Sequence, residues 1–365
     1  MIAQNDTTLR APFPWFGGKS RAAHIVWPRF GDTVNYVEPF AGSLAVLLQR
    51  PFPVRTETVN DADCYLANFW RALAHDPDGT ADYADWPVNE ADLHARHRWL
   101  INQTEFREQM MSDPEFYDVK IAGWWVWGIS AWIGSGWCSV DDTAALQIPH
   151  LADGGRGERR ARIQTKNGTC RPNLRPAQGV QRLSRKIPHL WGNRVASGQG
   201  INAKYARTNL HGYMRALQDR LRRTRVVCGD WTRIVGKSVT WKIGTTAVFL
   251  DPPYNESANR ADVYAVENRQ VSTFVREWAI ANGDNHKLRI ALCGYEAEHG
   301  PYMPDEWDCV AWDAGKGYAG QRKDGDNHNG KQERIWFSPH CLQPRFMGGI
   351  VDKNDYSCLF AGAVP

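Results

Sequence analysis

Four acidic side chains lie where short predicted strands of this sequence end, and acids in such places could bind the polar groups of a ligand. Glu38, Asp61, Asp230 and Asp251 each close a run of residues with strand character. The carboxyl ends of parallel strands meet at one edge of an open α/β sheet, and ligands bind in the crevice outside that edge. We therefore expect these four carboxylates to face a common site.

Asp251 opens the unusual run Asp251-Pro252-Pro253-Tyr254, which follows the apolar residues VFL. An ionised carboxylate only accepts hydrogen bonds, and Pro252 offers a carbonyl acceptor on a backbone that has no N–H of its own. Proline cannot donate to a sheet ladder, and a carboxylate is costly to bury, so the run is a poor continuation of a strand. By itself it is also compatible with an ordinary turn.

The run Phe40-Ala41-Gly42-Ser43 follows Glu38 and is typical of a tight turn, where the backbone can approach a ligand at the N-terminus of the next helix. Asp61 lies nineteen residues after Gly42, near the spacing of about twenty at which an acid accepts hydrogen bonds from a ribose. The turn has one glycine where the dinucleotide motif GxGxxG has three, which disfavours a pyrophosphate. S-adenosylmethionine has a ribose and an adenine but no phosphate, and it fits this pattern.

The elements that must hold these residues alternate between strands and helices. We predict a strand, a glycine turn and a helix over 36–50, helices within 62–79 and over 205–223 and 272–282, and strands over 56–63, 225–231, 245–251, 288–295, 306–313 and 333–340. The helix within 62–79 has one apolar face, made by Leu66, Phe69, Trp70 and Leu73. Pro77 and Gly79 are expected to stop the helix before them. This order predicts an α/β fold with a doubly wound, mostly parallel Rossmann-like sheet and a C-terminal β-hairpin.

A long insertion separates the second strand from the third. The segment 62–229 far exceeds the dozen or so residues that a sheet crossover needs, so most of it must form a separate lobe. We predict a sheet domain over 1–75 and 225–342, an inserted helical and irregular domain over 76–224, and a tail over 343–365. Residues 151–225 hold eighteen Lys or Arg against three acids, on a chain of net charge +4, which is typical of a surface that binds a polyanion.

Composition excludes several classes of protein. MIAQNDTTLR lacks the basic and then apolar order of a secretory signal, and no run approaches eighteen apolar residues, so we expect a cytoplasmic protein without a membrane span. The eight cysteines are scattered without a CxxC pair, which predicts reduced thiols and no metal site. Four tryptophans have spacings that a helix can bury, and core packing is expected for Trp124, Trp125, Trp127 and Trp132.

Four motifs in one order resemble the Dam-type (D12 class) DNA adenine-N6 methyltransferases. They are Phe13-Pro14-Trp15-Phe16-Gly17-Gly18-Lys19, Glu38-Pro39-Phe40-Ala41-Gly42, Asn60-Asp61 with the following Asn68-Phe69-Trp70-Arg71-Ala72-Leu73, and Asp251-Pro252-Pro253-Tyr254. The resemblance covers roughly 12–75 and 225–340, with a DNA-recognition insert between. It implies a methyltransferase sheet, S-adenosylmethionine as the methyl donor, and double-stranded DNA as the partner, bound through the basic segment 151–225.

The resemblance also implies roles for individual residues. It implies that the first motif, with Trp15, Gly18 and Lys19, contacts the methyl donor. The glycine turn, with Glu38, Phe40 and Gly42, would hold the methionine part of the donor. Asp61 would bind its ribose, and Asp230 and Trp231 would flank its adenine.

Asp251 and Pro252 would then act on the target base. The N6 lone pair of adenine is delocalised into the ring, and two acceptors that hold both N6 hydrogens can direct it at the methyl carbon and stabilise the charge developing on nitrogen. The base must first leave the duplex stack, and Tyr254 offers a face on which it can stack. A cytosine-N4 or RNA-adenine methyltransferase, and a catalytically idle DNA-binding accessory protein, are the alternative interpretations.

Overall fold

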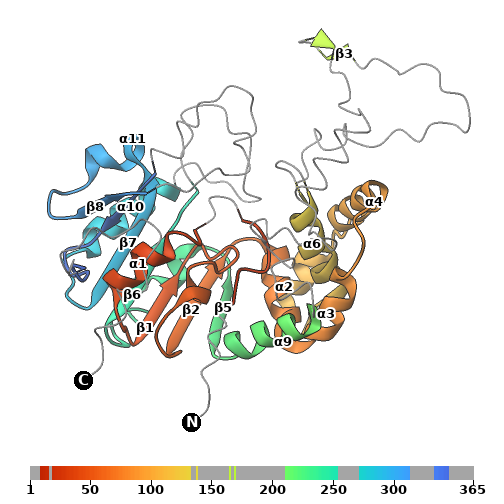
Figure 1. Ribbon diagram of the computed structural model, residues 1–365, viewed down its shortest axis with the longest axis horizontal. Coiled ribbons are helices and arrows are strands. Elements are labelled where there is room, and N and C mark those ends of the chain that lie inside the picture. The colour runs from red at the N-terminus through yellow and green to blue at the C-terminus, as the bar shows by residue number, and fades with distance from the viewer. Residues whose placement is uncertain are drawn as a thin grey trace, which may run out of the picture.

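The computed structural model describes residues 9–15, 19–132, 137–138, 210–253, 271–312 and 333–344, with the backbone of 164–165 and 168–169. A seven-stranded sheet in the order β5-β2-β1-β6-β7-β9-β8 forms its centre (Figure 1). The strands are β1 (Asn35–Glu38), β2 (Thr56–Asp61), β5 (Thr224–Cys228), β6 (Thr246–Leu250), β7 (Leu288–Tyr295), β8 (Asp308–Ala311) and β9 (Glu333–Phe337). A separate pair joins β3 (Gln164–Thr165) to β4 (Gly168–Thr169).

Strand directions follow the prediction in its main features. β5, β2, β1, β6 and β7 are parallel neighbours, whereas β9 is antiparallel to both β7 and β8. The predicted mixed α/β fold with a central sheet is thus confirmed. The chain between β8 and β9 lies outside the described residues, including the loop at 315–331.

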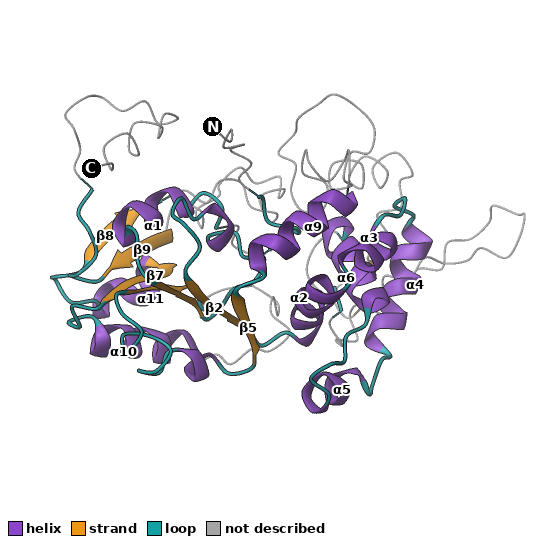
Figure 2. Ribbon diagram, turned by 90° about the horizontal axis from the view of Figure 1, so that it is seen from below, coloured by secondary structure: helices purple, strands orange, loops and turns teal. Residues whose placement is uncertain are grey.

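Both faces of the sheet are apolar because alternate residues of each strand enter different cores. Phe249 and Cys293 enter the core beneath α1 (Ala23–Phe30), whereas Leu250 and Leu292 enter the core beneath α10 (Val271–Asn282). Figure 2 shows α1 and α10 on opposite sides of the sheet. A central strand such as β6 is therefore buried on both faces, and only its ends can meet a ligand.

A helical lobe adjoins the β5 edge of the sheet (Figure 1). It contains α2 (Cys64–His75), α3 (Pro77–Ala84), α4 (Glu90–Ile101), α5 (Phe106–Ser112), α6 (Val119–Ala131) and α9 (Leu210–Leu221). The predicted apolar face of α2 is buried, and so are Trp125, Trp127 and Trp132, which confirms their assignment to the core. Shorter helical turns are η1 (Leu47–Gln49), η4 (Trp231–Ile234), α11 (Glu296–His299) and η5 (Gly300–Tyr302).

One local prediction was wrong. No α-helix follows the glycine turn, because Gly42 and Leu44 have φ values of 47° and 59°, which a right-handed helix excludes; only the three-residue η1 forms. The helix before Pro77 and Gly79 does end there, since α2 stops at His75, and these two residues lie in the first turn of the next helix, α3. Asp76 caps that helix by accepting a hydrogen bond from the Gly79 N–H at 2.8 Å, and proline is well tolerated in a first turn.

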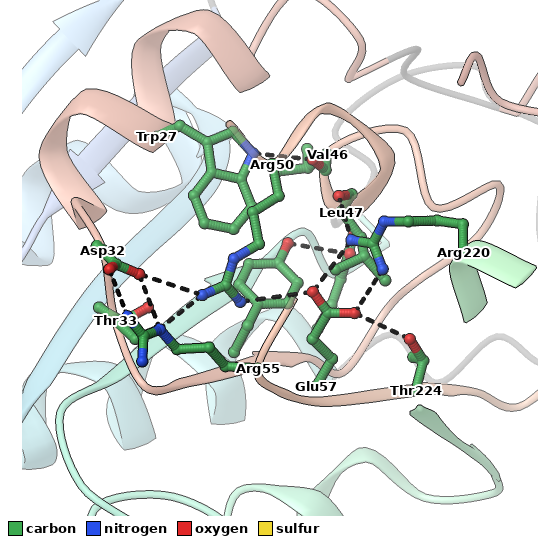
Figure 3. A network of polar contacts seen from close by, with 12 residues as sticks. Trp27, Asp32, Thr33, Val46, Leu47, Arg50, Arg55, Glu57, Arg220 and Thr224 are labelled. Atoms are coloured by element: carbon green, nitrogen blue, oxygen red, sulfur yellow. Dashed lines mark hydrogen bonds and ion pairs between the residues drawn. The ribbon is translucent and has the colours of Figure 1, made fainter. Parts of the chain in front are cut away.

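A fully buried carboxylate, Glu57 near the start of β2, ties the helical lobe to the sheet (Figure 3). Arg220 of α9 donates to its two oxygens at 2.8 and 3.0 Å, and the Thr224 hydroxyl donates at 2.9 Å. The guanidinium of Arg50 lies 3.4 Å away on the other side. Such a buried charge is tolerable only while its partners are present.

Replacing Arg220 with methionine is expected to lower the free energy of unfolding by about 3 kcal/mol, because Glu57 would lose two of its hydrogen bonds in the interior. Urea unfolding at neutral pH measures the change. The matched control is Arg222→Met, because Arg222 follows α9 directly and pairs with Asp219 at 3.5 Å between exposed side chains. This substitution should cost less than about 0.5 kcal/mol. Equal effects of the two substitutions would contradict the structural role of Arg220.

Candidate active site

The carboxyl ends of the parallel strands bring Glu38, Asp61 and Asp251 to one edge of the sheet, as predicted from their positions. β9 runs in the opposite direction, so its first residue, Glu333, lies at this same edge beside Tyr295 at the end of β7. Four carboxyl groups from four strands therefore line one edge. An edge with so many acids favours a cationic partner.

Lys19 supplies a cation within this edge. Its Nζ atom lies 3.1 Å from Oδ1 of Asp251 and 3.7 Å from Oε2 of Glu333, and 5.3 Å from the centroid of the Trp312 ring. The Lys19 side chain is 6% exposed and that of Asp251 14%. With so little water to screen it, the ammonium group strongly favours the ionised, acceptor form of the Asp251 carboxyl group.

Asp251 and Pro252 come directly after the last paired residue of the central strand β6, where Leu250 is in register with Leu292 of β7. The first proline is buried and lies beyond the ladder, so it removes no sheet hydrogen bond. The backbone can therefore leave the sheet here without the loss of a hydrogen bond between strands. The acid and the proline carbonyl come from one rigid strand end.

Glu38 is buried at the end of β1, with 2% of its surface exposed. The Tyr36 hydroxyl donates a hydrogen bond to its Oε2 at 3.0 Å. Burial raises the pKa of Glu38 well above its ordinary value, and the nearby charges of Asp251, Glu57 and Asp61 raise it further. The protonated form of Glu38 is thus favoured, and an approaching cation would favour its ionised form instead.

Asp61 is connected to the glycine turn. Its Oδ2 accepts a hydrogen bond from the Gly42 N–H and its Oδ1 one from the Asp63 N–H, both at 3.1 Å. Burial, together with the charge of Asp63, raises the pKa of Asp61 to about 6. The Asp61 carboxyl group therefore loses its proton, and can accept hydrogen bonds through both oxygens, only as the pH approaches neutrality.

Position 42 requires a glycine because of its backbone conformation and because of a neighbouring side chain. Its φ of 47° lies in the left-handed region, and a Cβ atom there would overlap the indole of Trp15. Trp15 is itself held edge-on by Phe13, with ring centroids 5.7 Å apart, and tilted against Trp125 of α6 at 6.3 Å. The first motif and the glycine turn thus form one packed unit.

Asn60 joins two turns at this edge, a role that its sequence position did not indicate. Its Nδ2 donates to the carbonyls of Pro39 and Gly229, both at 3.0 Å, and its side chain is buried. The turn after β1 and the turn after β5 are therefore held at a constant distance. The sequence signal for this role is an amide side chain, which can donate two hydrogen bonds, immediately before an acid at the end of a strand.

Glu333 and Trp312 were also not predicted. Only acids at strand ends were considered, and Glu333 begins its strand, so its place at the edge depends on the antiparallel direction of β9. Trp312 follows β8, and its backbone N–H donates to the Glu333 carbonyl at 3.3 Å. The predicted hairpin implies that these two strands are antiparallel to each other, but which of them pairs with β7, and in which direction, depends on tertiary packing.

The remaining predicted residues have mixed placements. Asp230 is exposed and caps η4 by accepting a hydrogen bond from the Thr232 N–H at 2.9 Å. Trp231 is buried, with its ring centroid 6.1 Å from that of Phe40 and 6.4 Å from that of Trp278 in α10. Their roles toward the donor stay predictions. Gly18, Tyr254 and most of the basic segment 151–225 lie outside the described residues.

Replacing Asp61 with asparagine is expected to remove part of the pH dependence of stability. A pKa raised from 3.8 to about 6 means that the folded protein binds more protons between these values. Asp61 therefore stabilises the fold below about pH 4, and this contribution is lost as the pH rises through 6. The shift corresponds to about 3 kcal/mol, and partial exposure of Asp61 reduces our expectation to about 2 kcal/mol.

Urea unfolding at several pH values from 4 to 7 tests this expectation. The free energy of unfolding of the wild type should fall more steeply with pH than that of Asp61→Asn. Loss of the Asp61 charge also removes one of the causes that raise the pKa of Glu38, and this change flattens the pH dependence in the same direction. Parallel curves would contradict the raised pKa of Asp61.

The acids cluster at the strand ends of a mixed α/β sheet, which is where open α/β sheets bind ligands, and part of the chain matches a known family. Residues 15–145 match the model of the family described as D12 class N6 adenine-specific DNA methyltransferase. The resemblance predicted from the sequence is thereby confirmed over this range, which includes Lys19, Glu38 and Asp61 and ends before Asp251. This match is to a family of DNA adenine methyltransferases and covers less than half of the chain, and a search of curated proteins found no match.

Two further observations concern only the described part of the chain. None of its helices has both the length and the apolar character needed to cross a membrane. No group of three or more His, Cys, Asp or Glu side chains there is arranged to hold a metal ion.

Proposed function

We propose that this protein transfers the methyl group of S-adenosylmethionine to N6 of adenine within a specific sequence of double-stranded DNA. The observation that carries the proposal is the placement of Asp251 and Pro252 at the end of β6. There Asp251 is paired with Lys19, at an edge that Glu38 and Asp61 share. The family match supports the class of reaction.

Residues around the glycine turn fit the donor. S-adenosylmethionine supplies an electrophilic methyl group on a sulfonium, and its methionine part carries an ammonium group. We propose that Glu38 binds this ammonium, which would favour the ionised form of a carboxyl group whose pKa is otherwise raised. Asp61, held by the N–H groups of Gly42 and Asp63, would accept hydrogen bonds from the ribose hydroxyls. Trp15, Gly18 and Phe40 complete the proposed pocket, with Asp230 and Trp231 beside the donor's adenine.

Asp251 and the Pro252 carbonyl act on the adenine amino group. Each accepts one N6 hydrogen, so the nitrogen lone pair is turned toward the methyl carbon, and the carboxylate stabilises the positive charge that forms on nitrogen. Lys19 keeps Asp251 ionised for this purpose. The target base is turned out of the duplex and stacks on Tyr254, while the arginine-rich segment 151–225 contacts the DNA phosphates.

The same proposal assigns the architecture. Segments 1–75 and 225–342 form the catalytic domain, with a doubly wound Rossmann-like sheet that β8 and β9 close as a C-terminal hairpin. Segment 76–224 is the inserted target-recognition domain, and 343–365 is a tail. Antiparallel pairing of β8 with β9 supports the hairpin.

A methyl-transfer assay tests the function. Protein incubated with unmethylated duplex DNA and S-adenosylmethionine labelled in the methyl group should transfer label that, after digestion of the DNA, runs as N6-methyladenine. Label found only in cytosine or only in RNA would favour the alternative methyltransferases. An absence of transfer to any nucleic acid, from protein that binds DNA, would indicate the accessory protein instead.

A further inference from the structure

Two thiols lie beside the acids of the candidate donor site. Cys228 is the last residue of β5 and is in register with Asp61 of β2, while Cys64 begins α2 three residues after Asp61. Cys64 lies in an apolar core against which Cys228 packs, and a hydrogen bond between the two thiols is the main cause of the shift in each one's pKa. Both are free cysteines, Cys64 being 9% exposed and Cys228 partly exposed.

The environment of Cys64 favours its thiolate. It occupies the first position of a twelve-residue helix, where the positive end of the helix dipole stabilises an anion. The hydrogen bond from Cys228 and the charge of Arg107 lower the pKa of Cys64 to about 7, while the same hydrogen bond and burial raise the pKa of Cys228. The helix N-terminus and Arg107 thus favour Cys64 as the nucleophile of the pair, and such asymmetry is typical of reactive dithiols.

We propose that Cys64 and Cys228 are a redox modification site, which forms a reversible disulfide with a peroxide as the oxidant and thereby weakens the neighbouring donor site. The Cys64 thiolate attacks one peroxide oxygen, the O–O bond breaks, and the departing hydroxide takes up a proton to become water, leaving a sulfenic acid. The Cys228 sulfur then attacks the Cys64 sulfur and the S–O bond breaks. The departing hydroxide takes the Cys228 proton, so two thiols are oxidised and one peroxide is reduced to two waters.

The disulfide would act on both turns that flank Asp61. Joining the sulfurs requires the first turn of α2 and the end of β5 to move together, since a disulfide bond is much shorter than a thiol hydrogen bond. The Asp63 N–H that donates to Asp61 precedes Cys64 directly, and the Gly229 N–H that donates to the Asp61 carbonyl at 3.1 Å follows Cys228. Oxidation therefore shifts two donors that orient the proposed ribose acceptor.

Peptide mapping of the full-length protein tests the chemistry. Reduced protein is treated with hydrogen peroxide, its remaining thiols are blocked with iodoacetamide, and the digest is analysed by mass spectrometry. We expect a linked pair of peptides that contain Cys64 and Cys228 and that separate on treatment with dithiothreitol. Cys309→Ser, which removes an exposed thiol, is the control and should still give this pair. Oxidation of Cys309 in the wild type without the linked pair would overturn the proposal.

A second variant makes the test independent of disulfide yield. In Cys228→Ser the sulfenic acid on Cys64 has no thiol to react with, so trapping with dimedone should label Cys64 more than in the wild type. The reverse variant, Cys64→Ser, should leave residue 228 unlabelled. Equal labelling of Cys64 in the wild type and in Cys228→Ser would show that Cys228 does not resolve the sulfenic acid, and would overturn the pairing.

The effect on the site rests on the proposed function and has its own measurement. Calorimetric titration with S-adenosylmethionine should give a dissociation constant about tenfold higher for the oxidised protein, restored by dithiothreitol and insensitive to peroxide in Cys64→Ser. Equal affinity of the oxidised and reduced forms would overturn the regulation. Lack of binding by the reduced protein would instead count against the proposed function, while peptide mapping still decides the disulfide.

Discussion

Replacing Asp251 with alanine is expected to slow methyl transfer by about a thousandfold, because one of the two acceptors that orient the adenine amino group and stabilise its developing charge is lost. The dissociation constant of S-adenosylmethionine should change little, since Asp251 is assigned to the base and not to the donor. Single-turnover transfer to duplex DNA measures the first quantity, and calorimetric titration measures the second.

The controls for this prediction separate chemistry from folding. Asp219→Ala removes a carboxylate that is 72% exposed on α9 and should leave transfer unchanged. Asp251→Asn keeps the side-chain volume and one acceptor oxygen, so its rate should lie between those of the wild type and Asp251→Ala. Wild-type turnover by Asp251→Ala would exclude the mechanism, and a parallel loss of donor binding would move Asp251 from the base to the donor.

Replacing Lys19 with methionine is expected to lower the rate of transfer at neutral pH by about a hundredfold and to make it recover as the pH is raised. Without the ammonium group 3.1 Å away, Asp251 lies among the carboxyl groups of Glu38 and Glu333 with less to favour its ionised form. The acid limb of the pH–rate profile should therefore move to higher pH. Transfer rates measured at saturating donor over a range of pH values test this directly.

Lys19→Arg is the matched variant, because it keeps the positive charge with a different shape. Its pH–rate profile should keep the wild-type acid limb even if the rate is lower. A donor-binding role for Lys19, which the sequence resemblance implies, would instead raise the KM for S-adenosylmethionine without moving the acid limb. The two roles are thus distinguished by which kinetic parameter changes.

The strands were predictable because their signals are local. Apolar residues of β6 enter the two cores in alternation, and such short apolar runs are recognisable without knowledge of their neighbours. The helix predicted after Gly42 failed for an equally local reason, since Leu44 adopts a positive φ that its apolar character does not reveal. Propensity and hydrophobic spacing do not indicate a left-handed backbone conformation at a non-glycine residue.

Electrostatic properties of the site were less accessible. The sequence indicated acids at strand ends, but the raised pKa of Glu38 results from burial and from three other carboxyl groups on neighbouring strands. Likewise, Arg215, Arg220 and Arg222 belong to the basic segment that was predicted to bind DNA. The structure pairs them with Asp78, Glu57 and Asp219, so part of that charge serves the fold.

The sequence by itself determined which groups are available for chemistry and which strands end in them, because a strand-end acid, a glycine turn and an Asp-Pro-Pro-Tyr run are all contiguous patterns. Only the tertiary structure decided which groups meet. Lys19 approaches Asp251, Glu333 enters the site from an antiparallel strand, and Asn60 joins the turns after β1 and β5. These contacts join residues far apart in the chain, and the order and direction of strands that create them depend on the packing of the whole sheet.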